Sequence, residues 1–219
     1  MDLRPSSPGR RKSLAAASRA YHEQLKTDQA ALAYLESRGL RSSADQAMLG
    51  VVRSPRQGHD RFLGRLAIPF IGPKGNVYDI RYRCIEDHDC KERGHGKYDA
   101  EHGYPTRLFN TRALVSPTDY IMVTEGEVDA LTLAACNWPA VGVPGANAWK
   151  AHHSRCFDGF SDIVVIGDGD DAGRKFVAAV VKTLPSARSV ILSAGEDVNS
   201  VYVKGGKDAL VAALKEDEA

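Results

Sequence analysis

The chain has 219 residues, of which 43% are hydrophobic and 26% charged, and its net charge is +1. This length and composition suit a globular protein with a sizeable core, arranged as one large domain or two small lobes. The sequence has no apolar run long enough to cross a bilayer, and its basic N-terminus lacks the apolar stretch of a signal peptide. We therefore expect a cytoplasmic protein without a membrane partner, whose four cysteines are reduced.

Charge is unevenly distributed along the chain. Residues 1–112 contain 20 Lys and Arg against 13 Asp and Glu, whereas residues 113–219 contain 9 against 15. A basic lobe joined to an acidic one suits a protein that holds both a polyanion and divalent cations. Uneven solvated surface charge explains the same counts, so composition alone leaves both explanations open.

The N-terminal part combines an irregular start with one clear helix. Residues 1–20 contain Pro, Gly, Ser and three consecutive basic residues, which predicts a flexible basic arm. A helix is expected from Thr27 or Asp28, either of which can cap it, to Arg38, with Gly39 as its stop.

Two strands and a long loop are expected next. The ranges 66–70 and 77–83 have strand composition and are separated by a turn that contains Pro73 and Gly75. The stretch 86–107 is rich in Gly and polar residues, which predicts a loop.

From Tyr120 onward, short apolar runs rich in β-branched residues alternate with helical stretches. The strands are expected near 120–123, 140–143, 163–166 and 189–193, and the helices near 127–136, 173–183 and 206–216. This alternation predicts a mainly parallel sheet with helical layers.

Acidic residues follow two of these strands directly. Glu125 comes after the first, and Asp168 and Asp170 come after the strand near 163–166. Ligands of parallel sheets bind beyond the C-terminal ends of the strands, so we expect the three side chains to meet in one pocket. Clustered carboxylates repel one another unless they are protonated or bridged by a cation such as Mg²⁺. The pattern therefore predicts metal-dependent phosphoryl chemistry.

Three motifs in this half resemble the TOPRIM domain that primases, topoisomerases and some nucleases share. They are Glu125-Gly-x-x-Asp129, Asp168-x-Asp170-x-Ala-Gly173 and Glu196-Asp197-Val198-Asn199. The preceding segment resembles the N-terminal half of a bacterial or phage DnaG-type primase core. The matching stretches there are Ala31–Leu40, Gly64–Phe70, Gly75–Val77, Lys97-Tyr98 and Leu108–Asn110.

The resemblance covers most of the chain and implies a fold and a division into parts. The fold class is α/β, with a TOPRIM parallel-sheet domain over residues 116–219. A smaller α+β basic lobe is expected to precede it, over residues 21–115, after the flexible arm. For a phage-encoded chain, cytoplasmic means the cytoplasm of the host.

The resemblance also implies roles for the acidic residues. Glu125 would be the acid/base or metal organiser, while Asp168 and Asp170 would take part in catalysis and hold Mg²⁺ or Mn²⁺. Asp197 would complete the metal site, and the secondary positions are Asp129 and Asn199.

Structural explanations compete with these roles. The Asp168 motif could be an acidic turn that caps a helix beginning near Gly173, with Asp171 best suited to the cap. The motif at Asp197 could be an ordinary loop before an Asn-capped helix.

Arginines in the strand near 77–84 are candidates for phosphate contacts. Alternation places Asp79, Arg81 and Arg83 on one face, which we expect to be exposed. The planar donor fork of arginine suits phosphate, although a plain solvated strand face gives the same pattern.

The resemblance sharpens this assignment. It implies that Arg83 and Lys97 line the nucleotide and template path. A further basic position of the family is matched imperfectly, because Thr111 stands there and Arg112 follows it.

Cys84, His88, Cys90 and His95 are possible zinc ligands. Their spacings are not those of a common structural zinc site. Alternation also puts Cys84 on the apolar face of its strand, so packing is the preferred interpretation for this residue.

The sequence as a whole predicts a DnaG-like primase core that synthesises short RNA primers on single-stranded DNA from ribonucleoside triphosphates. The alternatives are a TOPRIM nuclease and a non-catalytic, metal-dependent DNA-binding module of the recombination-mediator type. DnaG-type primases usually carry an N-terminal zinc ribbon and often a helicase-docking region. The matched segment leaves no room for either, so we expect a separate zinc-bearing protein or a replicative helicase as partner.

Overall fold

The computed structural model describes residues 6–145 and 148–215. The chain divides into two compact units, Met1–Pro105 and Thr106–Ala219. The division falls ten residues before the expected boundary, because Leu108 and Ala113 pack in the core of the second unit. Phe109 also belongs to the second unit, because it forms a β-bridge with Gly142 of that unit's sheet.

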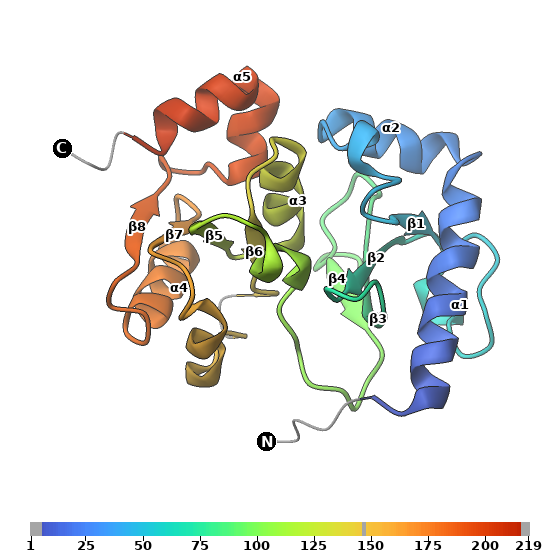
Figure 1. The fold of residues 1–219 in the computed structure, drawn as a ribbon. Coiled ribbons are helices and arrows are strands. Elements are labelled where there is room, and N and C mark those ends of the chain that lie inside the picture. The colour runs from blue at the N-terminus through green and yellow to red at the C-terminus, as the bar shows by residue number, and fades with distance from the viewer. Residues whose placement is uncertain (1–5, 146–147, 216–219) are drawn as a thin grey trace. The chain divides into compact units, whose positions relative to one another are not determined.

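The first unit is built on a four-stranded antiparallel sheet (Figure 1). Its strands, in spatial order, are β1 (Gly50–Val51), β2 (Leu66–Ile71), β3 (Val77–Arg83) and β4 (Tyr98–Ala100). The predicted pair of strands is confirmed as β2 and β3, and Gly75 in the turn between them has a φ of 76°. The expected loop 86–107 is wrong at β4, which extends the sheet by pairing with β3.

Helix α1 (Pro8–Leu25) contradicts the flexible arm from Pro8 onward. It packs against β1, β2 and β3, burying Leu14, Ala17 and Tyr21. The side chain of Ser7 caps its first turn by accepting a hydrogen bond from the Arg10 amide at 3.2 Å. The charged first turn masked an apolar stripe with helical spacing. Residues 1–5 of the expected arm lie outside the described residues.

Shorter helical elements complete the first unit. Helix α2 (Gln29–Ser37) is confirmed, with Asp28 as its N-cap and Gly39 following it at a φ of 64°. The 3₁₀ turns are η1 (Arg41–Ser43) and η2 (Asp60–Phe62).

The second unit contains the predicted parallel sheet. Its strands are β5 (Tyr120–Thr124), β6 (Ala140–Gly142), β7 (Asp162–Gly167) and β8 (Arg188–Ile191), in the spatial order β6-β5-β7-β8. All three neighbouring pairs are parallel. The strand residues from Ile163 to Gly167 are all buried, as expected for a continuous apolar run in a covered sheet.

Helices α3 (Glu127–Ala135), α4 (Asp171–Val181) and α5 (Val198–Ala213) follow strands β5, β7 and β8, with the 3₁₀ helices η3 (Thr111–Val115) and η4 (Ala151–Phe157) between elements. The helix predicted at 206–216 is only the second part of α5, which is interrupted by non-helical backbone at Gly205 and Gly206. Between β6 and η4, Ala146 and Asn147 lie outside the described residues. Within the described chain, no helix is long and apolar enough to span a membrane.

Candidate active site and basic residues

The acidic motifs lie at the point where the strand order of the parallel sheet reverses. From β5 the chain moves to β6 on one side, whereas β7 and then β8 lie on the other. Thr124 pairs with Ile166, so Glu125 after β5 and Asp168 after β7 emerge at the same edge from neighbouring strands. Ligands of doubly wound sheets bind at this position. The metal and catalytic roles of these two residues stay predictions.

Backbone hydrogen bonds join the loop after β7 to the loop after β8. The Gly169 amide donates to the Glu196 carbonyl at 2.8 Å, and the Gly195 amide donates to the Gly169 carbonyl at 3.0 Å. A Cβ at Gly169 would lie 1.8 Å from the Ser193 carbonyl oxygen. Glycine is therefore required in the Asp-Gly-Asp turn, because it lets the third acidic motif lie directly against the second.

Asp170 is the N-cap of α4, which corrects the expectation that Asp171 has this role. Its Oδ1 accepts a hydrogen bond from the Gly173 amide at 2.8 Å. Asp171 is exposed and pairs with Arg174 at 2.6 Å. The helix begins two residues earlier than expected, so the motif's second aspartate is both its cap and a candidate ligand.

Asp197 is the N-cap of α5, so the expected Asn cap is wrong. Its Oδ1 accepts from the Ser200 amide at 2.6 Å, and the Ser200 hydroxyl accepts in return from the Asp197 amide. The adjacent Glu196 pairs with Lys204, and hydrogen bonds from Lys204 and Ser200 hold the pKa of Glu196 below its usual value. Asp197 is half-buried beside the joined loops.

The two secondary positions tie α3 to α5. The Asn199 amide donates to Asp129 Oδ1 at 3.3 Å, and Asn199 Nδ2 donates to Thr132 Oγ1 at 2.9 Å. Asn199 is completely buried, and Asp129 is 8% exposed. These contacts indicate a structural role for both residues, since they fix the start of α5 against α3.

The acidic side chains suit a hard, oxygen-preferring cation. Glu125 and Asp168 are half-buried and Asp170 is exposed. Among the described residues, only a Cys/His group of the first unit brings three or more candidate ligand atoms close enough to share one ion. Mg²⁺ is usually held by one or two carboxylates together with waters and substrate phosphates. The spread of carboxylates at the sheet edge fits that mode of binding.

The basic face expected on β3 is largely covered, which corrects the prediction of an exposed arginine pair. Arg83 is only 5% exposed. Its guanidinium lies over the rings of Tyr34 and Tyr98, 5.9 and 5.0 Å from their centroids, and donates a hydrogen bond to the Tyr98 hydroxyl. Arg81 is half-buried and lies 4.6 Å from the centroid of the Tyr98 ring.

Asp79 of the same face is covered by an arginine of α1 that the sequence analysis placed in a flexible arm. Arg10 Nη2 lies 3.2 Å from Asp79 and 3.1 Å from Glu101. Burial raises the pKa of Asp79, although Arg10 opposes this shift. Lys97 and Arg112 are exposed, Lys97 before β4 and Arg112 in η3 of the second unit.

The residues that sequence reasoning missed are the aromatic partners of these arginines. Tyr98 follows Lys97 in the motif that carried the resemblance, so its position was a usable signal. Tyr34, in contrast, lies on α2 and approaches Arg83 only through the fold.

Comparisons with known proteins agree with this architecture. Residues 122–208 match the family model described as Toprim-like. The chain is 43% identical over 154 residues to the Gene 57 protein of Mycobacterium phage D29, covering 68% of this chain and 97% of that protein. It is 29% identical over 202 residues to the DNA primase of Aquifex aeolicus, covering 89% of this chain but only 36% of the primase.

Solved structures show the same fold over nearly the whole chain. A DNA primase domain from Pseudomonas aeruginosa superposes with a TM-score of 0.76 at 24% identity, covering 94% of this chain and 78% of that domain. A DnaG primase catalytic domain solved bound to single-stranded DNA gives a TM-score of 0.76 at 20% identity, with 94% and 80% covered.

These findings define the class as TOPRIM-domain proteins with the fold of a DnaG-type primase catalytic core. Within that class, the chain belongs to the family of the mycobacteriophage D29 Gene 57 protein. It spans about a third of the length of the curated Aquifex primase.

Proposed function

We propose that the chain is a primase catalytic core, a template-directed RNA polymerase that makes short primers on single-stranded DNA. One observation carries the proposal. Glu125 and Asp168 follow neighbouring parallel strands at the switch point of a TOPRIM sheet, in a chain with the DnaG-type fold. The names of its relatives, DNA primase among them, support the same activity.

The acidic residues divide the work. Glu125 would take the proton of the primer 3′-hydroxyl as this hydroxyl attacks the α-phosphate and pyrophosphate leaves, or it would organise the metal. Asp168, Asp170 and Asp197 would hold the ion. A bound Mg²⁺ or Mn²⁺ supplies charge neutralisation at the α-phosphate of the incoming ribonucleotide. The cap contacts of Asp170 and Asp197 restrict their rotamers, so both carboxylates are oriented before substrate arrives.

The exposed cations hold nucleic acid and nucleotide through their phosphates. Lys97 and Arg112 offer charges that solvent reaches, and half-buried Arg81 offers a donor fork held against Tyr98. Such contacts attract any single strand with little sequence preference. A replicative helicase or a separately encoded zinc-bearing protein would then supply the choice of start site.

The test is a synthesis assay with the purified chain, single-stranded DNA, labelled ribonucleotides, and Mg²⁺ or Mn²⁺. Short, template-dependent RNA products that disappear with a chelator are expected. Degradation of the labelled template without synthesis would favour the nuclease. Metal-dependent DNA binding with neither reaction would favour the recombination-mediator module, and either result would overturn the proposal.

A further inference from the structure

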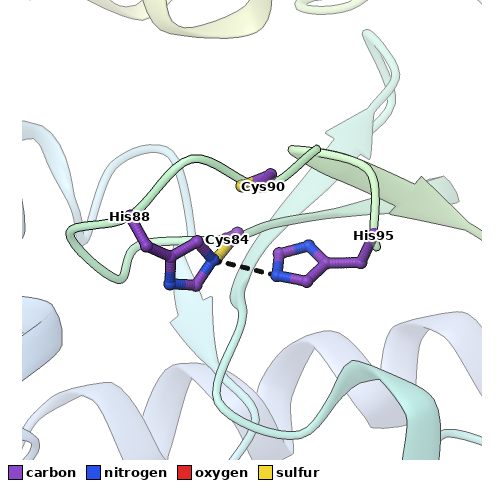
Figure 2. A group of neighbouring side chains, drawn as sticks. All are labelled: Cys84, His88, Cys90 and His95. Atoms are coloured by element: carbon purple, nitrogen blue, oxygen red, sulfur yellow. Dashed lines mark hydrogen bonds between the residues drawn. The ribbon is translucent and has the colours of Figure 1, made fainter. Parts of the chain in front are cut away.

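The loop between β3 and β4 gathers four metal-ligating side chains (Figure 2). Its base is closed where the Cys84 amide donates to the Lys97 carbonyl at 2.8 Å. Cys84, His88, Cys90 and His95 all lie in this loop, and one ligand atom from each falls within 4.8 Å of the others. The close-up shows the two imidazoles facing each other, with the two thiols beside them.

Two of the separations are close to those of ligands around one small ion. Cys84 Sγ lies 3.6 Å from His88 Nε2, and the two Nε2 atoms of His88 and His95 lie 2.9 Å apart. Zinc bonds of about 2.3 Å to sulfur and about 2.0 Å to nitrogen place tetrahedral ligand atoms roughly 3.3 to 3.8 Å apart. One observed separation falls in this range, and the other is slightly shorter.

Contacts behind the imidazoles turn the same nitrogen of each ring inward. His88 Nδ1 faces the Glu86 carboxylate at 3.3 Å, and His95 Nδ1 faces the Gly96 carbonyl at 3.1 Å. In His88 the proton then belongs on Nδ1, and Nε2 is left to bind a metal. A carboxylate or carbonyl behind a histidine is the usual support of a metal ligand in proteins.

One further charge borders the cluster. Arg65 Nη2 lies 3.2 Å from His95 Nδ1, and Arg65 Nη1 donates to the Gly96 carbonyl at 3.1 Å. These two contacts tie the His95 end of the loop to the residue that precedes β2.

The burial pattern of the loop also centres on these residues. Between residues 86 and 97, the side chains that are not exposed are His88, Cys90 and His95. Apart from Cys90, this stretch has only Gly, His and charged residues, so it cannot order itself around an apolar cluster. The packing interpretation for Cys84 is therefore wrong, since this half-buried residue lies just past the end of β3 and faces the two histidines.

We infer that Cys84, His88, Cys90 and His95 form a structural Zn²⁺ site in the first unit. Two thiolates and two imidazoles complete a tetrahedral shell with no position open to substrate, so the ion is structural and not catalytic. Its work is to fix the loop that carries Lys97 and leads into β4. The site uses none of the carboxylates of the second unit and does not depend on the proposed primase activity.

The first experiment measures metal in the whole chain purified from zinc-supplemented medium without chelators. About one tightly held zinc per chain is expected. Replacing the zinc with Co²⁺ should produce the intense visible d–d bands of a tetrahedral site and sulfur-to-cobalt charge-transfer absorption. A chain without stoichiometric zinc, or a Co²⁺ spectrum without sulfur bands, would overturn the site.

Variants then locate the metal. Cys84→Ser, Cys90→Ser and His95→Asn should each lose zinc and lower Tm, whereas the exposed controls Cys156→Ser and His102→Asn should retain zinc and the wild-type Tm. Zinc retained by the first three would place the ion elsewhere.

Two further measurements guard against ambiguous outcomes. If the cysteine variants do not fold, the wild-type chain carries the test, because removing its zinc must lower Tm and adding zinc back must restore it. A thiol count under denaturing, non-reducing conditions separates zinc from oxidation. Four free thiols support the site, and two would reveal a Cys84–Cys90 disulfide in its place.

Discussion

The two units place their charged residues in opposite ways. In the second unit, the motif carboxylates stand just past buried strands at the sheet edge, where Asp168 is half-buried and Asp170 exposed. In the first unit, Arg83 and Asp79 are buried within the fold. The acidic motifs of the second unit thus keep access to solvent, whereas these charges along the antiparallel strand are enclosed by the fold.

This contrast affects how much of the positive charge in the first unit is available to bind nucleic acid. The first unit is rich in Lys and Arg, but Arg10 pairs with both Asp79 and Glu101 in a largely buried ion-pair network. His59 extends this network from Glu101 to the hydroxyls of Tyr21 and Tyr82. Part of the basic composition thus stabilises the fold, and counting residues overestimates the charge available to DNA.

The largest expected effect tests the second unit. Asp168→Asn/Asp170→Asn should reduce primer synthesis at least about 100-fold, since metal-based charge stabilisation contributes several kcal/mol. The fold should remain, because Asn caps helices as well as Asp and the substitution relieves like-charge repulsion. Synthesis rates and thermal melting measure both effects.

Asp171→Asn is the matched control, because Asp171 adjoins the motif but is exposed and paired with Arg174. It should leave synthesis near the wild-type rate. Near-normal synthesis by the double variant would show that the site is assigned to the wrong residues.

A second prediction tests the buried charges of the first unit. Arg10→Ala leaves Asp79 and Glu101 without their cation, and both Arg10 and Asp79 have side chains only about a tenth exposed. Loss of one partner of a buried pair costs about 3 to 5 kcal/mol. Urea unfolding should show this loss. Lys12→Ala removes the same charge from an exposed position on α1 and should change little; equal stability of both variants would contradict the network.

The two units also differ in how well their structure could be predicted from the sequence. Strands β5 and β7 and their acidic ends were predictable because each of these strands is one contiguous run rich in β-branched residues with a carboxylate directly after it. Helix α1 was missed because the Pro, Gly and basic residues of its first turn masked the apolar stripe that follows them. The partners of Arg10 were beyond any local pattern, since they stand 69 and 91 positions away.

The roles of the site residues were predictable only in part. Resemblance selected Asp170 and Asp197, but their capping geometry depends on where α4 and α5 begin, which propensity fixes poorly. Likewise, the burial of Arg83 on β3 depends on Tyr34 from helix α2. Alternation along one strand carries no information about residues that pack on it from another element.

A third prediction concerns the contact between the acidic loops. Gly169→Ala forces a Cβ toward the Ser193 carbonyl, so the loop after β8 must move and take Asp197 with it. We expect a destabilisation of about 1 to 3 kcal/mol and reduced activity. At Gly159 an added Cβ would meet nothing within 4 Å, so Gly159→Ala is the control. Indistinguishable unfolding curves for the two variants would refute the close contact.

A fourth prediction separates functional from structural cations in the first unit. Lys97→Ala should leave Tm unchanged and reduce the salt dependence of DNA binding by about one counterion. Arg83→Ala should lower Tm, because it removes a buried guanidinium from between two aromatic rings. Fluorescence anisotropy over a salt series and thermal melting measure both. An unchanged salt slope for Lys97→Ala would remove Lys97 from the binding surface.

The smallest expected effect concerns a buried titratable group of the second unit that lies outside the candidate active site. His153 in η4 is 8% exposed, and its Nδ1 accepts from the Lys150 amide at 3.2 Å. Burial, helped by the nearby charges of His152 and Lys150, lowers the pKa of His153 from 6.5 to about 4. Because the folded-state pKa is depressed, the neutral ring's contribution to stability is complete above pH 6.5 and is lost as the pH falls toward 4.

The unfolding free energy of the wild type should therefore fall more steeply over this interval than that of His153→Asn. The exposed control His102→Asn should follow the wild type. Parallel pH profiles for the wild type and His153→Asn would show that His153 titrates normally. The buried ionisable groups that affect stability would then be those of the first unit.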